Sequence, residues 1–278
     1  MGTPLSKYAG SGYSEGHSIF VAALPQLDEQ PLFSAVNFDV SIYAYANHTV
    51  HVAAFKTLWC PSDPLISARA RLEDSFMDIP AGKHVVTYSS YGGCAGTWYN
   101  HPMGYTDDRM RRIPTFRVVA NGAFYLRSAV RFSQFGDGQS TTLLLGEHNQ
   151  AILSRKESRL WHWWYTGYFF ANLFDTRFPI NPSRRFKTHS ATITMPNAYT
   201  EAASSAHRGG AMFAFADGSV RFLKDSIDTW AFDGETGNPF GVVGDYGTPY
   251  FLRPGTRLGV YQSLSTRNGR ELVDANDL

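Results

Sequence analysis

Ala211-Met212-Phe213-Ala214-Phe215-Ala216-Asp217-Gly218-Ser219-Val220-Arg221-Phe222-Leu223 is the stretch that decides the fold class. Two runs of β-prone and aromatic residues flank Asp217-Gly218, and an Asp-Gly pair between such runs is a strong short-range signal for a β-hairpin. A two-residue type I′ turn needs positive φ at both central residues, which Asp and Gly tolerate. The stretch therefore predicts an antiparallel hairpin that turns at Asp217 and Gly218.

The composition of the whole chain agrees with a β-rich, loop-rich fold. Aromatic residues make up 15% of the 278 residues, and the chain holds 25 Gly and 14 Pro. This balance excludes an all-helical protein, since aromatic residues favour strands while Gly and Pro break helices. The net charge of +1 argues against nucleic acid or an anionic membrane as the main partner.

Three further segments predict secondary structure. Apolar residues recur at roughly helical spacing in residues 19–37, where Pro25 is compatible only with a first helical turn or with a break. Residues 85–91 are typical of a strand, and the glycines that follow indicate a close backbone approach or a bulge. Residues 141–145 predict a buried strand after the turn at Asp137-Gly138.

The two cysteines, Cys60 and Cys94, belong to no Cys-x-x-Cys pair, and no histidine cluster completes a zinc-ligand spacing. Two alternatives stay open for them. They are buried free thiols, or, in an oxidising compartment, they form a disulfide. Such a disulfide would close a loop of about 35 residues and contribute roughly 4 kcal/mol by the chain-entropy relation.

Six segments, in this order along the chain, carry a resemblance to a known family: residues 24–33, 58–64, 88–97, 136–147, 207–218 and 261–275. The second contains Cys60-Pro61-Ser62-Asp63. The fifth is His207, nine intervening residues and Asp217-Gly218. Together they resemble prepilin-type, processing-associated proteins, a large bacterial family of secreted, prepilin-like proteins whose core domain has no known function.

This resemblance implies an α+β, pilin-like fold, with an N-terminal helix remnant packed on an antiparallel β-sheet and a large β-rich, loop-rich insertion. We expect a single domain over residues 1–278. Residues 99–127 and 150–203 are expected to be insertions or long loops. Residues 204–278 are expected to form the C-terminal hairpin and tail that carry the signature.

Members of that family begin with a basic leader, a prepilin-peptidase site and a hydrophobic helix, and this sequence contains none of the three. Three explanations stay open: a piece limited to the soluble domain, a gene start assigned too late, or a variant that lost its anchor. We expect the domain to lie outside the cell or in the cell envelope, provided that the native precursor carries a leader. Contact with a membrane is expected only through the missing helix.

The function that the resemblance implies is that of a non-enzymatic structural subunit in an assembly like a type IV pilus or a type II secretion pseudopilus. The partners implied are like or related pilin subunits, with prepilin peptidase acting on the full-length precursor, and nucleic acid is not among them. His-Glu-x-x-His and the P-loop are both absent, which agrees with a protein that is not an enzyme.

The signature residues are interpreted as structural turns. They comprise His207, Gly209, Gly210, Asp217 and Gly218 in the C-terminal signature, and Asp137, Gly138 and Glu147 in the earlier one. A metal or acid–base pair of His207 with Asp217 is disfavoured, because a six-residue strand would hold them about 20 Å apart. No catalytic residue and no cofactor are assigned, and Asp137 and Asp217 are only weak candidates for calcium.

The aromatic run in residues 161–170 leaves three alternatives: a core segment, a protein interface or a sugar-stacking platform. Trp161, Trp163, Trp164 and Tyr165 are the candidates for a ligand or partner surface. The rival function is therefore an extracellular module that binds glycans or calcium through this aromatic insertion.

Overall fold

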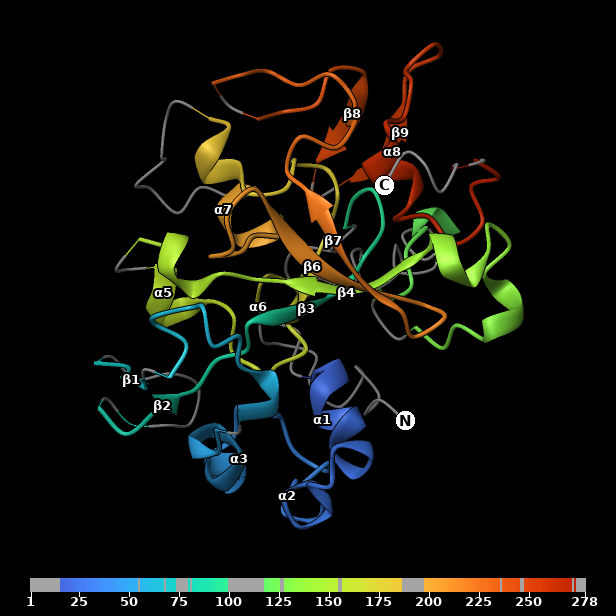
Figure 1. Cartoon of the computed structure of the whole chain (residues 1–278). Coiled ribbons are helices and arrows are strands. Elements are labelled where there is room, and N and C mark those ends of the chain that lie inside the picture. The colour runs from blue at the N-terminus through green and yellow to red at the C-terminus, as the bar shows by residue number, and fades with distance from the viewer. Residues whose placement is uncertain are drawn as a thin grey trace.

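A five-stranded sheet has the strand order β5-β3-β4-β6-β7. It lies at the centre of the molecule, where Figure 1 labels β3, β4, β6 and β7. Every neighbouring pair is antiparallel except β3 with β5, which is parallel. The computed structural model describes residues 16–54, 56–67, 69–73, 80, 82–99, 118–125, 128–154, 157–186, 198–235, 237–245, 248–271 and 273. The strands of the sheet are β3 (Tyr91–Cys94), β4 (Leu143–Glu147), β5 (Leu173–Phe174), β6 (Gly210–Phe215) and β7 (Val220–Lys224).

The predicted hairpin is confirmed as β6 and β7, but its predicted two-residue turn is wrong. The N–H of Phe215 donates to the Ser219 carbonyl, and the N–H of Gly218 donates to the Phe215 carbonyl. Gly218 has φ of +85°, whereas Asp217 is not among the residues with positive φ. The connection is therefore a three-residue loop, in which a type I turn is followed by a left-handed glycine that forms a bulge.

Each face of the sheet packs against its own hydrophobic cluster. Because side chains alternate along a strand, Phe213 and Phe215 share one face of β6 and are buried with Cys94, Tyr261 and other apolar residues. The opposite face carries Tyr91 and receives the first helix together with Trp163, Trp164 and Tyr165. The sheet is thus the middle layer between two cores.

The first core is built from short helices: α1 (Ile19–Ala23), α2 (Gln30–Ser34) and α3 (His48–Val52). The Ser18 hydroxyl caps α1 by accepting from the N–H of Val21 at 3.0 Å. A single helix does not run through residues 19–37, because a 3-10 helix (Leu24–Leu27) follows α1 and Asp28 takes a left-handed conformation with φ of +61°. Pro25 lies in the first turn of this 3-10 helix, at the point where α1 has ended, so both alternatives for Pro25 describe its position.

Helix α1 packs directly on the sheet. A Cβ atom at Gly93 in β3 would lie 2.8 Å from Ile19 Cδ1, so the absence of a side chain at Gly93 is what lets the helix approach. The predicted α+β fold with an antiparallel sheet is confirmed in a coarse form: the structure combines a mostly antiparallel sheet with short helices.

The segment 150–203, expected to be an insertion, supplies part of the central sheet and of both cores. It contains α5 (Glu157–Leu160), α6 (Phe169–Asn172), β5 and α7 (Ala198–Glu201). The N–H of Ala95, the residue after β3, donates to the Phe174 carbonyl in β5. The N–H of Asp175, the residue after β5, donates to the Glu201 carbonyl at the end of α7. Most of the other expected insertion, residues 99–127, lies outside the described residues.

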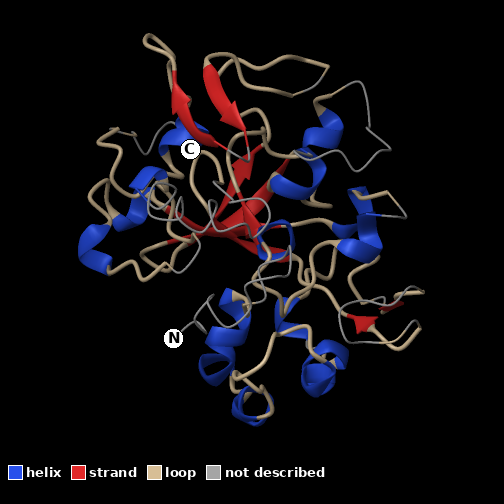
Figure 2. Cartoon of the chain, turned by 180° about the vertical axis from the view of Figure 1, so that it is seen from behind, coloured by secondary structure: helices blue, strands red, loops and turns tan. Residues whose placement is uncertain are grey.

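Two small sheets and one helix complete the fold (Figures 1 and 2). β1 (Ala70–Arg71) pairs with β2 (Val85–Val86), and β8 (Val242–Asp245) pairs with β9 (Thr248–Leu252). Helix α8 (Val260–Ser263) places Tyr261 against the second core. Within the described residues, no helix has both the length and the hydropathy that a bilayer crossing requires.

Candidate functional site

Three side chains from distant parts of the chain meet at one point: Cys60, Glu147 and His207. His207 Nε2 lies 3.6 Å from Cys60 Sγ and 3.3 Å from Glu147 Oε1. All three potential ligand atoms lie within 4.8 Å of one another, and no other such group of three occurs among the residues that the structure describes. We call this group the Cys60–Glu147–His207 cluster.

Glu147 is fixed by its place at the end of β4. It stands opposite Tyr91 in the register of β3 and β4. Its Oε2 accepts the N–H of Met212 at 2.7 Å. Met212 is the neighbour of Phe213, which is paired with Gly146, so the carboxylate satisfies a backbone donor of β6 next to the last pair between β4 and β6. The side chain is only 4% exposed. One carboxylate oxygen is therefore committed to the sheet, and the other is left for the cluster.

Cys60 is held by a turn that is anchored to the segment after β4. The N–H of Asp63 donates to the Cys60 carbonyl at 3.0 Å, which closes the turn. The Asp63 carboxylate then accepts from the N–H of Gln150 at 2.7 Å and from the N–H of Leu65 at 3.1 Å. Since Gln150 follows Glu147 by three residues, this bond ties the cysteine turn to the strand that carries the carboxylate.

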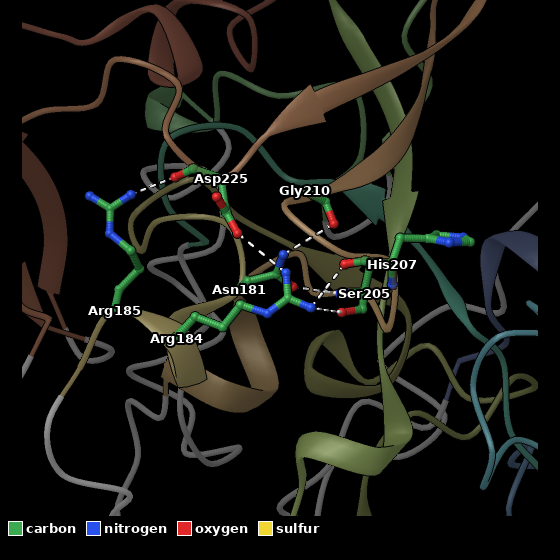
Figure 3. Close-up of polar contacts among 7 residues, drawn as sticks. All are labelled: Asn181, Arg184, Arg185, Ser205, His207, Gly210 and Asp225. Carbon is green, nitrogen blue, oxygen red and sulfur yellow. Dashed lines mark hydrogen bonds and ion pairs between the residues drawn. The ribbon is translucent and has the colours of Figure 1, made fainter.

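His207 lies in the loop that leads into β6, and its backbone is clamped from two sides. The Ser205 hydroxyl accepts its N–H at 3.0 Å, and the Arg184 guanidinium donates to its carbonyl at 2.8 Å. Arg184 also pairs with Asp225 at 3.2 Å. Figure 3 shows the imidazole of His207 extending away from this network. The ring is thereby aimed at the cluster by contacts of its backbone.

Asn181 reinforces the same loop. Its amide donates to the Gly210 carbonyl at 3.1 Å and accepts the N–H of Ser205 at 2.7 Å (Figure 3). Gly209, which lies between Ser205 and Gly210 in the loop, has φ of +82°, a conformation that favours glycine. The positive φ of Gly209 gives a structural reason for glycine at this point of the loop.

The surroundings of the cluster keep the metal-free cysteine neutral. Burial raises the pKa of the Cys60 thiol, and the negative charge of Glu147 raises it further. Hydrogen bonds from the backbone N–H groups of Ser62 and Asp63 act in the opposite direction, because they favour the thiolate. Burial raises the pKa of Tyr91, and the nearby Cys60 and Glu147 raise it further when they carry a negative charge.

The arrangement differs from that of a cysteine nucleophile with its base. In a nucleophile–base–orienter relay, one imidazole nitrogen contacts the thiol and the other contacts the acid. Here Cys60 and Glu147 both approach Nε2 of His207. The three groups converge on one centre instead of forming a line.

The predicted disulfide between Cys60 and Cys94 is wrong for this structure, in which both cysteines are free and buried. Cys60 lies beside Glu147, which is paired with Tyr91. Cys94 follows Tyr91 by three residues in β3, so it points to the opposite face and lies about 10 Å further along the strand. A disulfide requires Cα atoms within about 7 Å of each other.

Asp137 and Asp217, the calcium candidates, have their carboxylates engaged by nearby donors. Asp137 accepts the N–H groups of Gly269 at 2.6 Å and Arg270 at 2.7 Å. Asp217 accepts both the N–H and the hydroxyl of Ser219, at 2.9 and 2.7 Å. These contacts organise turns, and neither carboxylate joins the Cys60–Glu147–His207 cluster.

The aromatic candidates are part of the core. Trp163, Trp164 and Tyr165 are buried in the first core, while Trp161 is partly buried and stacks on Tyr168 with ring centroids 5.6 Å apart. The indole N–H of Trp164 donates to the Ala53 carbonyl at 2.9 Å. The prediction of a ligand surface is therefore wrong for the three buried residues, and the core alternative describes them.

The sequence also contains one Gly-x-Ser-x-Gly match, at Gly12-Tyr13-Ser14-Glu15-Gly16. Apart from Gly16, this stretch lies outside the described residues. A nucleophile elbow requires a strand before the serine, and the preceding Tyr8-Ala9-Gly10-Ser11 has no strand-like apolar run. The match therefore carries no catalytic assignment.

The grouping of Cys60, Glu147 and His207 is what reasoning from the sequence missed. Each residue lies in a different one of the segments that carry the family resemblance, and no short spacing in the sequence connects the three. The available signal was that three of the resembling segments contain residues with metal-ligating side chains: Cys60 and Asp63, Asp137 and Glu147, and His207 and Asp217.

Comparison with known proteins gives one match. A family described as "Protein of unknown function (DUF1559)" matches residues 2–229, well over half of the chain. No curated protein and no solved structure matches the chain.

Proposed function

We propose that this chain, which belongs to the DUF1559 family of unknown function, is the globular part of a pilin-like, non-enzymatic subunit of a cell-surface assembly. Its partners in this proposal are further copies of the chain or related subunits. The proposal takes its finer content from the six segments that resemble prepilin-type proteins.

The observation that carries the proposal is the outer strand of the sheet. β7 is an edge strand within the described sheet, and it exposes Val220 and Phe222, at 61% and 42%. An edge strand that exposes apolar side chains is a template for pairing with another chain, and β7 exposes them beside the cationic Arg221 and Lys224. A strand of this kind fits a subunit that is covered by a neighbour in its working state.

The packing of α1 against the sheet and in the first core supports the same proposal. Phe20, Val21 and Leu24 are buried in the first core, and Ile19 faces the sheet at Gly93. A helix docked in this way fixes the direction in which any preceding segment enters the domain. This arrangement suits a domain whose N-terminal helix holds it in a larger assembly.

Site-specific photo-crosslinking in cells that produce the native protein tests the proposal. A photoreactive residue at Val220 is expected to capture a like or related subunit in material sheared from the cell surface. The same residue at Phe132, which is 66% exposed and belongs to the 3-10 helix Phe132–Gln134 instead of the sheet, is the matched control and is expected to capture much less.

Substitution of the same strand gives a second readout. Phe222→Ser should reduce recovery of the protein in the surface fraction, whereas Phe132→Ser should leave recovery unchanged. Recovery only as a monomer away from the cell surface would refute the assembly role. Equal behaviour of the two substitutions would show that β7 is not the contact.

A further inference from the structure

We propose that Cys60 Sγ, Glu147 Oε1 and His207 Nε2 bind one divalent transition-metal ion of the zinc class, with a fourth position open to solvent. This inference stands independently of the assembly role, because it rests on the geometry of the cluster alone.

The distances between the ligand atoms fit a tetrahedral ion. Zinc bonds of about 2.3 Å to sulfur and about 2.05 Å to nitrogen, at the tetrahedral angle, place the two atoms about 3.5 Å apart. The observed distance between Cys60 Sγ and His207 Nε2 is 3.6 Å. Bonds of about 2.05 Å to nitrogen and to oxygen place those atoms about 3.3 Å apart.

The distance between His207 Nε2 and Glu147 Oε1 is 3.3 Å. A direct charge-assisted hydrogen bond between an imidazolium and a carboxylate is shorter, at about 2.7–2.9 Å. The spacing is thus wide for a hydrogen bond and right for two ligands of one ion. Two of the three distances between ligand atoms thus match those around a tetrahedral ion, and the third, from Cys60 Sγ to the Glu147 carboxylate, is at most 4.8 Å.

The donor set selects the kind of ion. One thiolate, one imidazole and one carboxylate suit a borderline-soft ion such as Zn²⁺, while Ca²⁺ and Mg²⁺ require mostly oxygen ligands. A thiolate and a carboxylate together balance the two charges of the ion, which allows it to bind in a mostly buried place. Cys60 is 5% exposed and the Glu147 side chain 4%.

The fourth position follows from the exposure of the third ligand. The His207 side chain is 37% exposed, so solvent reaches the cluster from that side. Three protein ligands with an accessible fourth position are typical of zinc sites that bind a water or an exogenous ligand, whereas closed structural sites use four protein ligands.

The surroundings support all three ligands from behind. Met212 holds the second oxygen of Glu147, Asp63 closes the turn at the Cys60 carbonyl, and Arg184 holds the backbone of His207. Such outer contacts fix the orientation of ligands and are a regular part of metal sites.

The balance of protons is simple. On binding, the Cys60 thiol loses its proton to solvent, and the sulfur lone pair forms the bond to the metal. No electron is transferred, and no bond other than S–H is broken. Affinity for the metal is therefore expected to rise with pH.

Cobalt titration of the purified full chain, first stripped of metal by a chelator, tests the site. Co²⁺ is expected to bind at one equivalent with the visible bands of a tetrahedral ion and the near-ultraviolet band of a cobalt–thiolate bond. Zn²⁺ is expected to displace it and abolish both bands, and to raise the melting temperature of the chain.

The variants are chosen to separate ligation from folding. Cys60→Ser should abolish the thiolate band, and Glu147→Gln and His207→Asn should each weaken binding by more than about 100-fold, since loss of outer-shell contacts alone costs about 10–100-fold. Glu147→Gln keeps a carbonyl oxygen for Met212. Cys94→Ser is the matched control and should bind cobalt like the parent chain.

Far-ultraviolet circular dichroism of each variant shows whether it has kept the fold. Three results would overturn the proposal: no cobalt or zinc binding by the folded parent chain, a cobalt spectrum without a thiolate band, or binding that survives Cys60→Ser and His207→Asn unchanged. A thiolate band lost in Cys94→Ser would also overturn it.

Discussion

Replacing His162 by Asn tests how the interior of the protein holds a neutral histidine. His162 is buried, its ring stacks on that of His148 with centroids 4.5 Å apart, and its backbone has φ of +61°. Asn is among the few residues that accept this left-handed conformation, so the substitution removes the titrating ring without straining the backbone.

The expected pH effect follows from the shift in pKa. Burial lowers the pKa of His162 from 6.5 to about 4, with a hydrogen bond to the backbone of Thr200 acting in the opposite direction. Between these two values the unfolded chain binds a proton that the folded chain does not bind. Stability therefore falls as the pH decreases through this window.

The magnitude at about pH 5 depends mainly on the ordinary pKa. At a pH about 1.5 units below that value, an unfolded histidine gains about 2 kcal/mol from protonation, while the folded one gains almost nothing. The parent chain thus loses about 2 kcal/mol through His162 alone between about pH 7.5 and pH 5. His162→Asn does not incur this loss.

Urea unfolding of the parent chain and of His162→Asn at both pH values is the assay. The substitution should destabilise the protein near neutral pH, because it removes a buried ring. That penalty should be about 2 kcal/mol smaller at about pH 5. An equal penalty at both pH values would refute the neutral histidine, and a larger penalty in acid would mean that the folded state holds the proton.

Three further outcomes are expected. Phe213→Ala should lower the free energy of unfolding by about 3–5 kcal/mol in urea titrations, because the ring is buried in the second core; a loss below about 1 kcal/mol would contradict that packing. Thiol titration without reductant should find Cys60 and Cys94 both reactive in the denatured chain; no free thiol there would restore the disulfide. Arg184→Met should weaken zinc binding about 10–100-fold through the loop of His207, and unchanged affinity in calorimetry would show that the clamp does not matter.

The parts of the fold that could be predicted are those with a local signal. The β6–β7 hairpin follows from its alternating apolar runs and the Asp-Gly pair, and the end of α1 just before Pro25 follows from the geometry of proline. The details of the hairpin loop did not follow, because Asp217-Gly218 suits more than one turn. Ser219 pairs back to Phe215, which adds a third residue to the connection.

The parts that could not be predicted depend on contacts between distant segments. β5 contains only Leu173 and Phe174, and it becomes a strand because β3 lies beside it. The aromatic run around Trp164 is compatible with a surface or a core, and only the packing of α1 and α3 around it decides in favour of the core.

The candidate site likewise depends on contacts between segments that are distant in the sequence. Cys60, Glu147 and His207 share no spacing in the sequence, and their convergence is set by three local devices. These are the turn closed by Asp63, the end of β4 and the loop clamped by Arg184. Each of these local structures is reasonable by itself, so none of them predicts from the sequence that the three side chains meet.

The most direct measurement of the metal proposal, on which this account of the site depends, is anomalous X-ray diffraction at the zinc absorption edge. The crystals would be of the full chain grown with an equimolar amount of Zn²⁺. The account predicts one strong peak bonded to Cys60 Sγ, Glu147 Oε1 and His207 Nε2, with the sulfur about 2.3 Å from the metal. A peak held by other residues, or no peak in well-diffracting crystals of the folded chain, would contradict it.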